Sequence, residues 1–129
     1  MITEDYVSFE VAKLLKEKGF DEKVDTYYLI HPSGFSEFFF DKKDEFVFPE
    51  VVWLKCPTHQ MSMKWLRKVH NILLFLLPTQ EDGKLVYLVE VWTWNEEEGI
   101  YESTYAPMPR KEPEQAIEAA IKYSLENLI

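Results

Sequence analysis

The residues best suited to bind a metal are Cys56 and His59, which lie three positions apart. A structural zinc site needs about four sulfur or nitrogen ligands within about 2.0–2.3 Å of the ion. His70 follows on the same predicted helix, and eleven residues separate it from His59. At the rise of a helix that is about 16 Å, too far to share one ion. We therefore expect no metal and no stoichiometric zinc, with His59 on the surface.

Cys56 is also the only candidate for a cysteine nucleophile. It directly precedes a predicted helix, where a helix N-terminus can lower the pKa of a thiol. Catalysis would further require a base held beside the sulfur. The sequence alone shows no such base, so we favour a structural role for Cys56 as a small, partly buried residue.

Loops that bind phosphate need clustered glycines, which let backbone N–H groups approach the anion. The four glycines of this chain are isolated from one another, and each falls where an element should end or turn. This excludes a P-loop, a dinucleotide-binding fingerprint and the G-x-S-x-G nucleophile elbow. We expect no cofactor and no catalytic residue, and the favoured interpretation is that the protein is not an enzyme.

Two groups of residues remain as a possible partner surface. Lys64, Arg67 and Lys68 form a compact basic face on the second predicted helix, which could contact phosphate or an acidic partner. Cations are also favoured near a helix C-terminus, and we favour a solvated face. Trp92 and Trp94 could form a binding surface or simply pack within a sheet.

Three helices are expected, at residues 8–18, 57–70 and 113–128, and the second of them carries the basic face. Ser8 is a good N-cap and Gly19 suits the position just beyond the helix end. The expected buried face of the second helix consists of Met61, Trp65, Leu66 and Val69. That of the third consists of Ala116, Ile117, Ala120, Ile121, Ser124 and Leu128.

The strands should lie at residues 24–30, 35–40, 51–54, 72–77, 85–94 and 100–105, with a charged loop at 41–50. The first two form a hairpin, the third a short edge strand, and the last three an antiparallel meander with short connections. We predict an α+β fold in one domain, residues 1–129. Its antiparallel sheet combines the meander with the N-terminal hairpin, and the three helices pack mainly on one face.

The strand at 85–94 is apolar on both faces. One face holds Leu85, Tyr87, Val89 and Val91, and the other holds Val86, Leu88, Trp92 and Trp94, interrupted only by Glu90. A half-solvated antiparallel strand should instead alternate apolar and polar residues. The second face therefore needs a cover, either the N-terminal part of the chain or another protein. We favour partial cover by the N-terminal part together with a modest homodimer contact.

The chain has 129 residues, of which 47% are hydrophobic and 16% aromatic, and its formal net charge is −9. Such an acidic surface repels nucleic acid and anionic lipid at long range. One cysteine allows no intrachain disulfide and fits a reducing compartment. There is no apparent signal peptide, and the longest apolar run is far too short to span a bilayer. We expect a soluble, acidic, cytoplasmic protein without a membrane partner.

From the second helix onward the predicted order is α-β-β-β-α, as in double-stranded-RNA-binding domains. Those domains place a basic cluster at the start of the last helix. Here Arg110 and Lys111 are followed by Glu112, Glu114 and Glu118. The charge therefore argues against RNA binding, and the shared order alone is fold-level analogy.

Three stretches resemble a group of small uncharacterised proteins from Bacteroides-type genomes, often found in prophage-like or mobile elements. They are FEVAKLLKEKGF (9–20), PTHQMSMKWLRKVHN (57–71) and AAIKYSLENLI (119–129). His59 and Lys68 depart from the pattern, which has an apolar residue and an acid there. The resemblance implies a cytoplasmic protein in a mobile-element setting and transfers no catalytic residue.

These observations favour a non-enzymatic accessory module that acts through protein–protein contact, with a protein partner or a second copy of itself. The alternative is a nucleic-acid-associated protein that uses the basic face of the second helix. An enzyme ranks third.

Overall fold

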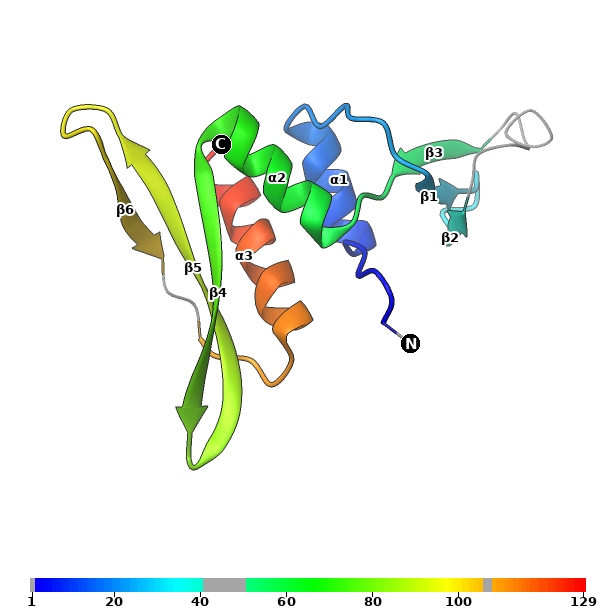
Figure 1. Ribbon diagram of the computed structural model, residues 1–129. Coiled ribbons are helices and arrows are strands. Elements are labelled where there is room, and N and C mark those ends of the chain that lie inside the picture. Colours follow the sequence, from blue (N-terminus) through cyan, green and yellow to red (C-terminus); the bar gives the residue numbers. More distant parts are fainter. Residues whose placement is uncertain (1, 41–50, 106–107) are drawn as a thin grey trace. The chain divides into compact units, whose positions relative to one another are not determined.

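The computed structural model describes residues 2–40, 51–105 and 108–129. It has an α+β fold, with three helices and two three-stranded antiparallel sheets (Figure 1). The chain forms two compact units, residues 1–58 and 59–129, and each is described by itself. No helix in the described part of the chain has the length and apolar character needed to cross a membrane. A single domain remains a prediction.

The first helix, α1 (Phe9–Glu17), begins and ends as its sequence predicts. The Ser8 side chain accepts a hydrogen bond from the Val11 amide at 3.2 Å, which satisfies one of the unpaired N–H groups of the first turn. Gly19 has a φ of +94°, and the Phe20 amide donates to the Leu15 carbonyl at 2.9 Å. This is the Schellman ending that Gly19 indicates.

The first unit contains a sheet of three strands, β1 (Thr26–Ile30), β2 (Ser36–Phe40) and β3 (Val52–Lys55). Their order is β2-β1-β3, so β3 is an edge strand as predicted, and it packs against α1. The predicted hairpin is also confirmed, because β1 pairs antiparallel with β2. The predicted loop at 41–50 lies outside the described residues.

The second unit contains the predicted meander, β4 (Ile72–Glu81), β5 (Lys84–Asn95) and β6 (Ile100–Tyr105), in the order β4-β5-β6. The hairpin and the meander thus belong to separate sheets. Asp82 and Gly83 both have positive φ, 52° and 76°, as a two-residue type I′ turn requires. The ladder therefore continues to the turn itself, and β4 extends four residues beyond the predicted Leu77.

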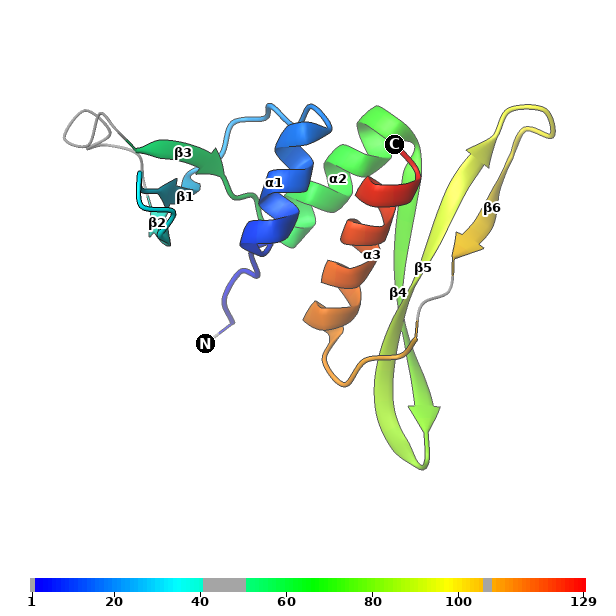
Figure 2. The same ribbon diagram turned by 180° about the vertical axis from the view of Figure 1, so that it is seen from behind.

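Two helices, α2 (His59–His70) and α3 (Pro113–Asn127), pack on one face of this sheet, against β4 and β5 (Figure 2). The start predicted for α2 at residue 57 is two residues early. Pro57 and Thr58 are engaged in the first unit, where the Val7 amide donates to the Pro57 carbonyl and Tyr6 forms a β-bridge with Thr58.

The buried face predicted for α2 is partly wrong. Met61 and Val69 are exposed, at 36% and 56%, whereas Trp65 and Leu66 are buried as expected. The remaining buried residues are His59 and Ser62. The buried stripe of α2 is therefore rotated toward two polar side chains. For His59 a partner is present, because its Nε2 lies 2.7 Å from Oε2 of Glu118, as expected for a buried polar group.

The buried face of α3 is close to the prediction. Its buried residues are Ala116, Ala120, Ile121, Ser124 and Leu125. Ile117 is only half-buried, and Leu128 is the C-cap, outside the helical stripe. Ser124 is accommodated because its hydroxyl donates to the Ala120 carbonyl at 2.8 Å. Such a bond to the preceding turn is common for a serine inside a helix.

Candidate protein-binding surface

The face of the second sheet opposite α2 and α3 carries a row of large apolar side chains. Val89 and Val91 of β5 are fully buried, and side chains alternate along a strand. Leu88, Trp92 and Trp94 therefore point to the other face. Directly paired residues share a face, and the β4–β5 register adds three residues of β4. Glu90, the ladder partner of Phe75, also lies on this face and is half-buried. We call this the outer face, and its apolar residues are Leu73, Phe75, Leu77, Leu88, Trp92 and Trp94.

The outer face is partly exposed and rich in aromatic contacts. The exposed fractions of Phe75, Leu77 and Trp94 are 47%, 38% and 40%. Phe75 lies edge-on to Trp92 with ring centroids 6.2 Å apart, and Trp94 packs against Tyr101 at 5.0 Å. Val86, which the sequence also places here, is buried, so the exposed patch is shorter than predicted. The patch has the composition typical of the centre of a protein interface.

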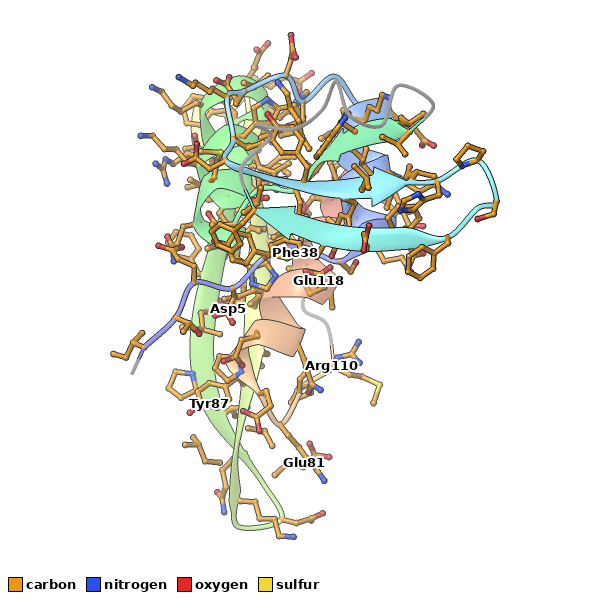
Figure 3. All side chains as sticks on the ribbon, turned by 90° about the vertical axis from the view of Figure 1, so that its right-hand side faces the viewer. Asp5, Phe38, Glu81, Tyr87, Arg110 and Glu118 are labelled. Carbon is orange, nitrogen blue, oxygen red and sulfur yellow. The ribbon has the colours of Figure 1, made fainter. Side chains whose placement is uncertain are left out.

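The sheet also has an unpaired edge along β4, its outermost strand. The backbone N–H and C=O of Tyr87 on β5 each form a 2.7 Å hydrogen bond with the backbone of Arg110, so both groups point away from β4. Figure 3 shows Arg110 beside the hairpin of β4 and β5 that carries Tyr87, with Glu81 nearer to the tip of the hairpin. Pro78 is paired with Tyr87, and its nitrogen must therefore point outward, where a missing N–H breaks no ladder bond.

The alternation along β4 then fixes which backbone groups face outward. Leu74, Leu76 and Gln80 have the same parity as Pro78, so their N–H and C=O groups point out of the sheet. We call this row the open edge. It is a preformed template for another strand, because each outward group lacks a ladder partner within the sheet.

The basic face lies at one end of the open edge. A groove of about 650 Å³ runs between α2 and residues 72–75, and Lys64 and Arg67 line it. Lys68 is exposed but does not line the groove. The structure therefore brings two of the three predicted basic residues to the start of β4. Leu73 and Phe75 line the same groove, so Lys64 and Arg67 border the outer face, which also carries Trp92 and Trp94.

His59 is buried, and its predicted surface position is wrong. Its exposed fraction is 6%, and its Nε2 lies 2.7 Å from Oε2 of Glu118. In a catalytic triad the second ring nitrogen would contact a nucleophile. Nδ1 of His59 is buried without a hydrogen-bond partner in the described part of the chain. The contact between His59 and Glu118 joins α2 to α3. No local sequence pattern indicates it, because 59 positions separate the two residues.

Cys56 is fully buried, and its thiol donates to the Val7 carbonyl at 3.4 Å. Cys56 is thus more deeply buried than the partly buried position predicted from sequence, and its structural role stays a prediction. Among residues 2–40, 51–105 and 108–129, no three His, Cys, Asp or Glu side chains are placed to hold a metal ion. The absence of stoichiometric zinc stays a prediction, which elemental analysis of the purified protein would test.

Searches with the sequence and the structure found no matching family model, no matching curated protein and no matching solved structure.

Proposed function

We propose that the protein is a non-enzymatic interaction module that binds a protein partner through the outer face of its second sheet. The observation that supports this most strongly is the joint exposure of Phe75, Leu77 and Trp94 on one sheet face. Scattered apolar residues are normal on a surface, but a contiguous patch of large ones marks a site of contact. We further propose a cytoplasmic location and an accessory role in a mobile element, on the single cysteine and the resemblance described above.

The energetics favour contact with an apolar surface. Covering apolar area yields about 25 cal/mol per Å², so a large side chain that is still 40% exposed gains on the order of 1 kcal/mol when covered. Several such side chains next to one another add their free energies of burial, so together they favour a contact that a single side chain would not hold. Aromatic residues are also the commonest energetic centres of interfaces.

The test replaces Trp92 and Trp94 by serine and measures the melting temperature and the mass in solution. Trp94 is 40% exposed, so we expect a modest loss of stability together with loss of any association. The matched control is Trp65→Ser on α2, where the tryptophan is only 6% exposed and removal should lower the melting temperature much more. If the melting temperature falls as much in W92S/W94S as in W65S and the mass in solution is unchanged, Trp92 and Trp94 are ordinary core residues.

The alternative function is nucleic-acid binding by the basic face. Lys64, Arg67 and Lys68 are all exposed, and none of them forms an ion pair with another described residue. Against this stands the net charge of −9, which opposes the approach of a phosphate backbone at long range.

A further inference from the structure

We propose that the open edge of β4 pairs antiparallel with the same edge of a second copy of this chain. Two three-stranded sheets would then join across a two-fold axis into one sheet of six strands. The inference rests on the proposed interaction function and names its partner. It uses the outward backbone groups of β4 and not the side chains of the outer face, so the two can be tested with different substitutions.

The open edge lacks most of the protection that edge strands usually have. Natural proteins blunt edge strands with charged residues, bulges or short length. β4 has ten residues, pairs with β5 without a bulge, and contains no charged residue from Ile72 to Gln80. Leu76, at its centre, is 43% exposed. Pro78 is the one blunting residue, and it leaves the outward N–H groups of Leu74 and Leu76 in place.

The two ends of β4 lie beside residues of opposite charge. Lys64 and Arg67 line the groove beside the start of β4, whereas Glu81 and Asp82 stand at its end. Antiparallel pairing across a two-fold axis places the start of one β4 opposite the end of the other. Both ends of the interface then bring basic residues near acidic ones, so the edge is complementary to itself.

Charge also decides between the possible orientations. A parallel pairing would place basic ends together and acidic ends together, which costs free energy. An unrelated peptide strand would need its own acidic end to match Lys64 and Arg67. A second copy of this chain already has such an acidic end, because Glu81 and Asp82 follow the same strand that begins beside Lys64 and Arg67.

The first experiment replaces Leu76 by proline, which removes an outward N–H but no bond to β5, as Pro78 already does. Leu76→Ala is the matched control, since it removes the side chain and keeps the N–H. Mass is measured by analytical ultracentrifugation over a range of concentrations, and sheet content by circular dichroism. We expect dimers for the wild type and L76A, and at least tenfold weaker association for L76P with its sheet retained.

The second experiment is a charge exchange, which remains informative if L76P fails to fold. Arg67→Glu and Glu81→Arg should each weaken the dimer, because each places like charges together at both ends. The combination R67E/E81R should restore association to near the wild-type level. Recovery of this kind requires the two residues to approach each other between copies.

Three results would overturn the inference. One is a dimer that persists in L76P and is insensitive to the charge reversals. If W92S/W94S breaks that dimer, the outer face remains the contact and only the edge pairing fails. The second is a wild-type monomer at every concentration, in which case the melting temperature of W92S/W94S still decides the proposed function. The third is growth into open-ended polymers, which a closed two-fold pairing does not allow.

Discussion

Nε2 of His59 lies 2.7 Å from Oε2 of Glu118, and this contact joins the first residue of α2 to the middle of α3. His59 is nearly fully buried, whereas the Glu118 side chain is 25% exposed. Removing one partner of such a pair leaves a polar group in a poorly solvated site, which usually destabilises a protein more than the bond itself contributes.

We therefore predict that His59→Ala lowers the free energy of unfolding by about 1–3 kcal/mol. Glu118→Gln should cost less, because the amide oxygen can still accept from the imidazole. Urea denaturation of both single variants and the double variant gives the coupling between them. Glu126→Gln, at an exposed position of the same helix, is the control and should change stability little. Strict additivity of the two single effects would contradict the contact.

Gly19 offers a test of the first unit. Its φ of +94° is unfavourable for any residue with a Cβ, and an added Cβ would meet no atom within 4 Å. Gly19→Ala should therefore lower the free energy of unfolding by about 1–2 kcal/mol, because alanine strains the backbone in this conformation. Gly19→Asn should be less damaging. Thermal or urea unfolding measures it, with Glu17→Ala as a surface control on the same helix. Unchanged stability in G19A would mean that α1 does not end in this conformation.

His70 should make stability depend on pH. Burial lowers the pKa of His70, so the unfolded chain binds its proton more readily than the folded one. The contribution of neutral His70 to the free energy of unfolding is fully present above the ordinary histidine pKa of about 6.5. It declines as the pH falls through that value toward the lower pKa of the folded state. Because other groups also titrate, the measurement compares wild type with His70→Gln. The wild type should lose more stability on acidification, and identical pH profiles would contradict the prediction.

The basic face separates the two functional hypotheses. We predict that reversing Lys64, Arg67 and Lys68 to glutamate leaves the fold intact by circular dichroism. Neither wild type nor variant should bind duplex nucleic acid at physiological salt, because the net charge of −9 opposes it. Wild-type binding at micromolar concentration, weakened by added salt and abolished in the variant, would instead support the nucleic-acid alternative.

Much of the local structure follows from the sequence alone. Ser8 and Gly19 define the two ends of α1, and Asp82-Gly83 defines the tightest turn. These positions are determined by backbone dihedral preferences and by hydrogen bonds within a few residues. Because such interactions are local, the three helices, the hairpin and the meander all lie close to their predicted positions. The alternation along β5 also predicts that Leu88, Trp92 and Trp94 share one face of the strand, whereas Val86 on the same face is buried.

The tertiary structure decides what depends on residues far apart in the chain. It separates the strands into two sheets, and it makes β4 an edge, so that Pro78 is accepted inside a strand that the sequence ends at Leu77. It also rotates the buried stripe of α2 toward His59, because Glu118 on another helix supplies a hydrogen-bond partner. Periodicity along one element cannot indicate which strand lacks a neighbour or where a buried polar group finds its partner. These depend on the packing of other elements against it.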